Sequence, residues 1–251
     1  DGSTTTWTQL GGDIDGANAD DWFGYSVSLS DDGAILAVGA ISNDSNGSNS
    51  GQVRVFQLVN DDWTSIGDPI NGRGEFDHFG ESVALSADGT IVAGGTIGRY
   101  YTLVYQFQNG NWNQLGFDIP GIAASVALSH DGTVLVVFGF ETRVYGLMNN
   151  EWTRIGDAID SGIDVIVNPL SSSVSLSADG RIVAIGAPWN DGNDSTDSNR
   201  GAAYVYQNVN DNWIQVGSDL YGANEGDNFG ESVLKPQSPC ALRVLPSAQQ
   251  K

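Results

Sequence analysis

The 251-residue chain has little of the residue types that proteins use for cross-linking and for catalysis. Its single cysteine, Cys240, excludes an internal disulfide framework. Its two histidines, His78 and His130, both fall in predicted surface turns. No G-x-S-x-G, H-E-x-x-H or phosphate-loop pattern occurs. We therefore predict that the chain is not an enzyme.

Positive charge and long apolar runs are also scarce. The 10 Lys and Arg residues face 31 Asp and Glu residues, which gives a net charge of −21. Such a surface repels phosphate backbones and anionic lipid headgroups, so binding to nucleic acid is not expected. The longest apolar run, residues 133–140, is shorter than the roughly 18 residues that span a bilayer. The chain begins at Asp1, which favours a processed or trimmed N-terminus.

Glycine is abundant, and much of it lies in a repeated hairpin pattern. Residues 79–95, FGESVALSADGTIVAGG, predict two strands joined by an Asp-Gly turn. This dipeptide is a strong hairpin signal, because Gly adopts the positive φ of the turn without steric cost. The pattern recurs at residues 26–40, 125–139 and 173–187, and a fifth copy begins at Phe229.

Two further motifs complete each repeat. An alternating segment ends near an Asn-Asp or Asn-Gly pair, which tolerates a left-handed backbone and predicts a second hairpin. The strand after it carries Trp, an aliphatic residue and Gly at fixed spacing, and we predict that these tryptophans are buried in the core. The tryptophans are Trp7, Trp63, Trp112, Trp152 and Trp213.

Four short strands that recur every 50 residues or so predict an all-β protein, a β-propeller of four-stranded blades. About five blades, or a fragment of a larger ring, fit the chain. Residues 7–16 supply a last strand and residue 229 begins a first strand, so we expect the terminal blade to combine both chain ends. The propeller is assigned to residues 1–233. Residues 234–251 form an anomalous tail, interpreted as a degenerate or frame-corrupted blade.

The Phe-Gly before the hairpin and Gly186-Ala187-Pro188 after it resemble the FG-GAP repeat, the blade unit of integrin α-subunit propellers and of many secreted microbial and algal proteins. The resemblance implies the same fold, although residues 123–124 and 171–172 lack the Phe-Gly. Many blades of that family carry a calcium loop of D-x-D-x-D-G type. The tight Asp-Gly turns of this chain offer one carboxylate each, so we do not expect calcium there.

Two longer loops, residues 41–50 and 189–200, hold other candidate sites. Oxygen donors in the second loop make calcium a candidate cofactor, and a plain hydrophilic loop is the alternative. These donors are Asp191, Asn193, Asp194 and Asp197. Candidate glycosylation acceptors, each followed by x-Ser, are Asn43, Asn46 and Asn193.

Three aspartates stand two residues before the Phe of a Phe-Gly pair: Asp21, Asp77 and Asp227. We predict that they accept hydrogen bonds from backbone N–H groups at the tight start of the first strand. The functional alternative is an acidic ring on one propeller face that binds cations or a basic partner.

These features favour a secreted or cell-surface module for binding, adhesion or matrix contact, which recognises an extracellular protein or glycan through one propeller face. A self-assembling surface-layer or fibre protein is the second hypothesis, because an incomplete terminal blade invites strand exchange between chains. A propeller enzyme of the glycosidase or lyase type is the third.

Overall fold

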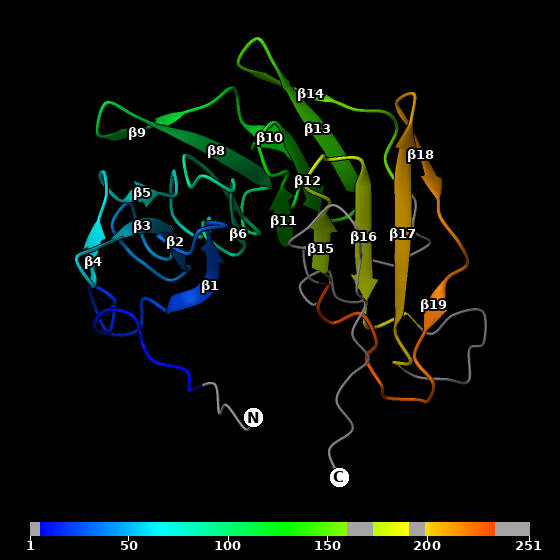
Figure 1. Ribbon diagram of the computed structural model, residues 1–251, viewed down its shortest axis with the longest axis horizontal. Coiled ribbons are helices and arrows are strands. Elements are labelled where there is room, and N and C mark those ends of the chain that lie inside the picture. The colour runs from blue at the N-terminus through cyan, green and yellow to red at the C-terminus, as the bar shows by residue number, and fades with distance from the viewer. Residues whose placement is uncertain (1–5, 160–172, 191–198, 234–251) are drawn as a thin grey trace, which may run out of the picture.

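The computed structural model describes residues 6–159, 173–190 and 199–233, and these fold entirely into strands, turns and loops. The strands form four antiparallel sheets, named blades 1 to 4 in chain order (Figure 1). Within the described part, nothing resembles a helix that could cross a membrane.

Each blade has four strands in sequence order, and three blades add a two-residue strand that pairs with the third strand. Blade 1 holds β1 (Phe23–Leu29), β2 (Ile35–Ala40), β3 (Gln52–Val59), β4 (Asp62–Ser65) and β5 (Ile70–Asn71). Blade 2 holds β6 (Val83–Leu85), β7 (Ile91–Gly95), β8 (Tyr101–Gln108), β9 (Asn111–Gln114) and β10 (Ile119–Pro120). Blade 3 holds β11 (Ser125–Leu128), β12 (Val134–Phe138), β13 (Thr142–Met148) and β14 (Glu151–Arg154). Blade 4 holds β15 (Ser173–Leu176), β16 (Ile182–Ala187), β17 (Ala202–Val209), β18 (Asn212–Gln215) and β19 (Leu220–Tyr221).

The blades follow one another around an arc. Their first strands, β1, β6, β11 and β15, lie toward the middle, and the fourth strands lie at the periphery (Figure 1). Three hydrophobic clusters fill the interior, and each is shared by two successive blades. The predicted propeller architecture is thus confirmed, because every cluster is completed by a neighbouring blade.

The Asp-Gly turn is the best-defined local structure of the repeat. In blade 2, Gly89 has a φ of +68°, as the hairpin prediction required. The Ser86 hydroxyl donates to Asp88 Oδ1 at 2.7 Å and accepts from the Ile91 amide at 2.9 Å. Asp88 Oδ1 also accepts from the amide of Thr90 at 3.0 Å. The carboxylate of each turn therefore closes the turn. The equivalent hydroxyl–carboxylate bonds join Ser30 to Asp32, Ser129 to Asp131 and Ser177 to Asp179.

Successive blades are joined by hydrogen bonds along the inner strands. The hydroxyl of Ser82 accepts from the amide of Val126 at 3.0 Å, and Ser125 accepts from Val174 at 3.2 Å. The glycine that ends the second strand has a related role. A Cβ on Gly39 would lie 2.2 Å from the carbonyl oxygen of the next blade's Phe-Gly pair, so only glycine fits there. This contact gives a physical reason for the paired Phe-Gly and Gly-Ala motifs.

The tryptophans are not fully buried as predicted, although Trp112, Trp152 and Trp213 pack against the edges of the hydrophobic clusters. The four that lie in strands are half-buried at the outer edge of their blades. Each donates its indole Nε1–H to a carbonyl of the preceding blade, as Trp112 does to Ile66 at 2.9 Å. A tryptophan has a polar N–H that needs a partner, so a blade seam suits it better than an apolar interior.

The two described ends of the chain continue the repeat beyond four blades. The amide of Val233 donates to Ser173 at 3.0 Å, which is the bond that joins the inner strands of complete neighbouring blades. Trp63 donates to the carbonyl of Leu10, so residues near 10 occupy the outer-strand position before blade 1. The number of blades, the joint terminal blade and the tail of residues 234–251 remain predictions, since the tail lies outside the described residues.

Candidate functional site

The propeller has two ends with different loops. At the turn face lie the Asp-Gly turns and the hairpins that join third to fourth strands. At the opposite end, the segments before each first strand meet the connections from second to third strands. We call this end the loop face. It comprises residues 16–25, 41–51, 72–82, 96–100 and 139–141.

Exposed aromatic side chains gather on the loop face. Trp22 is 60% exposed, and Phe76 and Tyr100 are each 55% exposed. Tyr25 and Phe140 are also exposed. Large aromatic rings that are left in water are candidates for contact with a partner, since they bury much apolar area at little cost in side-chain entropy.

The backbone under three of these rings is unusual. Trp22, Phe76 and Tyr100 have φ angles of 55°, 61° and 61°. Positive φ is unfavourable for a bulky residue, and such outliers are concentrated at functional sites. At the position of Phe76 in the repeat, blade 1 has Asp20 and the fifth copy has Gly226. The loop fold itself therefore does not require an aromatic residue.

The aromatic residues form two groups. The rings of Trp22 and Tyr25 lie stacked, with 6.1 Å between centroids and 28° between planes. Tyr100 and Phe140, from blades 2 and 3, lie 6.5 Å apart. The loop of Phe76 is bonded to the loop of Tyr100, because the amide of Gly98 donates to the carbonyl of Asp77 at 3.3 Å. The two groups provide apolar contact area over blades 1 to 3.

Asp77 lies beneath this surface and organises the loop. It is 0% exposed. Its Oδ2 accepts from the amides of Arg73 at 2.7 Å and Gly74 at 2.9 Å, and from the hydroxyl of Tyr101. Its Oδ1 lies 3.2 Å from Nε of Arg99. Burial, together with the bond to Asp77, raises the pKa of Tyr101, which therefore stays a hydroxyl donor.

The other two predicted aspartates make comparable contacts in their own loops. Asp227 Oδ2 accepts from the amide of Asn224 at 2.8 Å. Asp21 is buried and accepts from the side-chain amides of Asn43 at 2.7 Å and Asn18 at 3.2 Å. The carboxylates of Asp21 and Asp77 thus point inward to their loops. Their participation in an acidic binding ring remains a prediction.

A buried carboxyl group lies between blades 1 and 2. Glu81 Oε1 accepts from the hydroxyl of Tyr25 at 3.0 Å, while Oε2 is buried without a hydrogen-bond partner among the described residues. Burial raises the pKa of Glu81, because it disfavours the charged form more than the bond from Tyr25 favours it. Burial and the charge of Glu81 in turn raise the pKa of Tyr25. The hydrogen bond thus connects Tyr25, an exposed aromatic residue of the loop face, to the buried carboxyl group of Glu81.

The remaining predicted sites have different outcomes. The candidate calcium ligands Asp191, Asn193, Asp194 and Asp197 lie outside the described residues, as does the glycosylation acceptor Asn193. Asn46 donates its amide Nδ2 to the carbonyl of Gly72 at 2.8 Å, but it is exposed and stays a candidate acceptor. Asn43 is buried and bonded to Asp21, so its amide nitrogen is not accessible in the folded protein. Among the described residues, no cluster of three or more His, Cys, Asp or Glu side chains could hold a metal ion.

The aromatic residues of the loop face were missed in the sequence, although a signal was present. Phe76 lies where the other copies have Asp20 and Gly226, and Trp22 lies where they have His78 and Asn228. Large aromatic residues at positions that otherwise favour turn formers indicate a surface role. Their exposure and left-handed backbone became evident only in the structure.

Solved structures share the fold of this chain. It is 14% identical to a candidate 6-phosphogluconolactonase from Bacteroides uniformis, with a TM-score of 0.56, and the match covers 78% of this chain and 54% of that protein. It is 15% identical to the hydrazine synthase of Kuenenia stuttgartiensis, with a TM-score of 0.53, and covers 84% of this chain and 53% of that one. A protein from Lactobacillus plantarum has 11% identity, a TM-score of 0.54 and coverages of 77% and 54%.

The chain spans about half the length of these proteins, and at such identities the similarity concerns the fold alone. A search of curated proteins found no match. The FG-GAP repeat family matches residues 14–56 and residues 170–206, which cover the first two strands and part of the third strand of blades 1 and 4. These two segments are therefore similar to the FG-GAP repeat, and the described part of the chain folds as the blades of a β-propeller.

Proposed function

We propose that this chain is a non-enzymatic, extracellular binding module that recognises a glycan or a protein through its loop face. The observation that carries the proposal is the set of three exposed aromatic residues, Trp22, Phe76 and Tyr100, on a left-handed backbone. A fold gains nothing from rings that it leaves in water on an unfavourable backbone. The repeated loop has positive φ at these positions in its other copies too, as at Asp20, His78 and Asn228, so contact with a partner is the reason for placing large aromatic residues there.

The chemistry of the face favours a neutral or basic partner. Aromatic rings pack on the C–H faces of sugar rings and on apolar side chains, and the carboxylates around them repel anions. With a net charge of −21, the protein disfavours sulfated or phosphorylated chains. A neutral glycan is therefore the partner to test first, and a protein with a basic surface is the second.

An extracellular location and the absence of catalysis belong to the same proposal. FG-GAP repeats are typical of extracellular propellers, and this supports a secreted or cell-surface location. The enzyme names of two similar structures describe those proteins, and at 14–15% identity they support a common fold only.

Self-assembly is the second candidate function, and β1 favours it. Val27 and Leu29 of β1 are exposed, whereas their counterparts Val83 and Leu85 in blade 2 are buried by the neighbouring blade. An exposed apolar inner strand is a surface on which a further blade or another chain can pack. Light scattering on the purified protein over a range of concentrations separates a monomer from an assembling chain.

A glycan array combined with a panel of matrix proteins tests the binding proposal. The variants Trp22→Ala, Phe76→Gly and Tyr100→Gly should lose binding while remaining folded. Met148→Ala is the matched control, because Met148 is an exposed apolar residue at the turn face. Binding that survives all three loop-face substitutions, or no binding to either panel, would overturn the proposal.

A further inference from the structure

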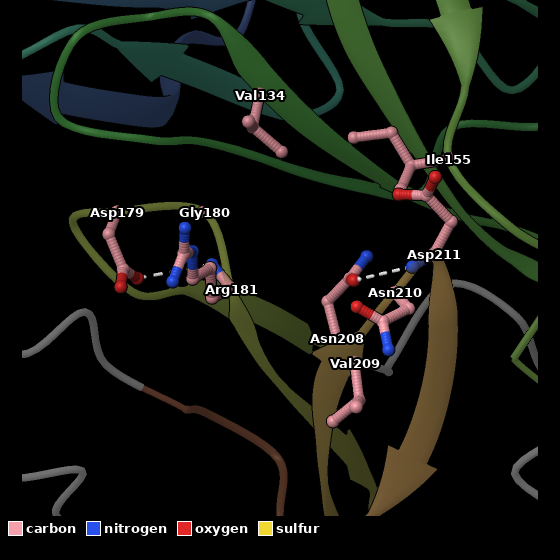
Figure 2. A pocket seen from close by; sticks show the side chains of 9 residues that line it. All are labelled: Val134, Ile155, Asp179, Gly180, Arg181, Asn208, Val209, Asn210 and Asp211. Atoms are coloured by element: carbon pink, nitrogen blue, oxygen red, sulfur yellow. Dashed lines mark hydrogen bonds between the residues drawn. The ribbon is translucent and has the colours of Figure 1, made fainter.

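A cavity of about 480 Å³ opens at the turn face between blades 3 and 4. Val134 and Ile155 line it from blade 3, and the Asp-Gly turn and outer hairpin of blade 4 line it from the other side (Figure 2). This volume is within the usual range of small-molecule sites. None of these residues belongs to the loop face.

A comparison of the four blades explains the cavity. In each blade, one amide near the end of the third strand donates at 2.8 Å to the carbonyl of the residue after the Asp-Gly turn. The donors are Leu58, Phe107, Leu147 and Asn208, and the acceptors are Ala34, Thr90, Thr133 and Arg181. Because the same hydrogen bond occurs in all four blades, the four donors occupy one structural position and the four acceptors occupy another. Blade 4 alone among the four has a polar side chain at both the donor and the acceptor position, Asn208 and Arg181.

The apolar residues at these positions fill the seam between blades. Phe107 of blade 2 lies against Trp112, with 5.1 Å between ring centroids, and against Gly67 of blade 1. Leu147 of blade 3 packs on the cluster that blades 2 and 3 share. Asn208 does not extend into its seam in this way. Its Oδ1 accepts from the amide of Asp211 at 3.0 Å, so the side chain is turned to its own hairpin (Figure 2).

The lining of the cavity has hydrogen-bond donors, hydrogen-bond acceptors and an aliphatic surface. Arg181 and Asn208 provide N–H donors, and Asp179 and Asp211 provide carboxylate acceptors. The bond from Ser177 and the amide of Arg181 lower the pKa of Asp179, which is therefore ionised at neutral pH. Val134 and Ile155 provide apolar contact area beside these groups.

We infer that this cavity binds a small neutral saccharide, one or two sugar residues in size. Sugar hydroxyls donate and accept hydrogen bonds, and so they match a site with guanidinium, amide and carboxylate groups together. The C–H groups of the sugar ring match Val134 and Ile155. An anion is disfavoured by the net charge of −21, and a strong cation is disfavoured by Arg181. The inference does not depend on the loop face.

Saturation-transfer NMR with a pool of glucose, galactose, mannose, N-acetylglucosamine and cellobiose tests this inference. The measurements use protein with the Trp22→Ala, Phe76→Gly and Tyr100→Gly substitutions, which remove loop-face binding, and this protein should give transfer to at least one sugar. Asn208→Leu should abolish the transfer, because leucine restores the filler found at positions 58 and 147 and the variant should fold normally. Arg181→Thr, the residue of blades 2 and 3, should weaken binding about tenfold through loss of a charged hydrogen bond.

Met148→Ala in the same background is the control, because Met148 is exposed and does not line the cavity, and it should leave this transfer unchanged. Loop-face binding is removed throughout this experiment, so failure of this inference is distinct from failure of the proposed function. The inference is overturned if no sugar in the pool receives transfer, or if Asn208→Leu leaves the transfer unchanged. Transfer to lysine or glucuronate in place of the neutral sugars would equally refute it.

Discussion

The indole Nε1 of Trp63 lies 3.0 Å from the carbonyl oxygen of Leu10 and donates a hydrogen bond to it. The same bond recurs at every described blade seam, from Trp112 to Ile66, Trp152 to Leu115 and Trp213 to Ile155, each at 2.9 Å. The tryptophans therefore connect blades, and the segment around Leu10 stands in for the outer strand of a blade before blade 1.

Trp152→Phe should destabilise the protein modestly, because it removes the indole N–H and keeps an aromatic ring in the seam. We expect the free energy of unfolding to fall by about 1 kcal/mol, the usual net value of one hydrogen bond. Urea denaturation measures it. Trp7→Phe is the control, because Trp7 is 100% exposed. An equal loss in both variants would refute the seam role of the indole.

Stability should decrease in acid through the Asp-Gly turns. Burial alone would raise the pKa of Asp131, but hydrogen bonds from Ser129 and Thr133 outweigh it and lower the pKa. A lowered pKa in the folded state contributes stability above the unfolded value of 3.8, and this stability is lost as the pH falls through the folded value. Asp88 and Asp179 have lowered pKa values as well.

Asp131→Asn tests this contribution by urea unfolding between pH 2 and pH 7. The variant should be less stable than the wild type at pH 7, and the two should converge as the pH falls below the pKa of the folded carboxyl group. A difference in stability that stays constant down to pH 2 would show that the charge of Asp131 makes no contribution.

Glu81→Gln should have the opposite pH dependence. Burial raises the pKa of Glu81, so its ionised form opposes folding at neutral pH and this cost disappears in acid. The glutamine side chain keeps an acceptor for the Tyr25 hydroxyl. We expect the variant to be more stable than the wild type at pH 7 and to match it below pH 4.5, the unperturbed value. A variant that is less stable at pH 7 would contradict this account.

Phe76→Gly should separate stability from binding. Glycine adopts the φ of 61° without the steric cost that phenylalanine bears, and Gly226 stands at the same position of the fifth copy. The free energy of unfolding should rise by up to about 1 kcal/mol, since relief of strain exceeds the entropy lost by glycine. Partner binding should weaken at the same time. Thermal unfolding and the glycan array measure the two effects, and a less stable variant would show that the ring supports the loop.

The sequence was sufficient to predict the architecture, because each strand and turn of the repeat is specified by residues close together in the chain. Asp88-Gly89 predicts its hairpin through the φ that glycine allows, and Asn149-Asn150 predicts the outer hairpin, where both residues have positive φ. The alternating Ser and Val of the first strands predict one small and one apolar face. These patterns need only the chain near them, and the four blades confirm them.

The site depends on neighbouring blades, and for that reason the sequence was less informative. The exposure of Trp22 and the left-handed backbone of Tyr100 depend on how the loops of neighbouring blades meet, and a reading of each segment by itself does not show them. Tryptophan is a large, mostly apolar residue, and for that reason we predicted that it lies in the core. Its position between blades depends on the hydrogen bond from the indole N–H to a carbonyl of the preceding blade. Asn208 was visible as an exception only once the hydrogen bonds aligned the four blades.

Hydrogen–deuterium exchange with the most tightly bound partner from the array is the most direct test of the loop face as the binding surface. The account predicts slower exchange in residues 20–25, 74–78 and 98–101 on addition of the partner, and unchanged exchange in the Asp-Gly turns of blades 1 to 3. Protection confined to the turn face, with the loop-face segments unaffected, would contradict it.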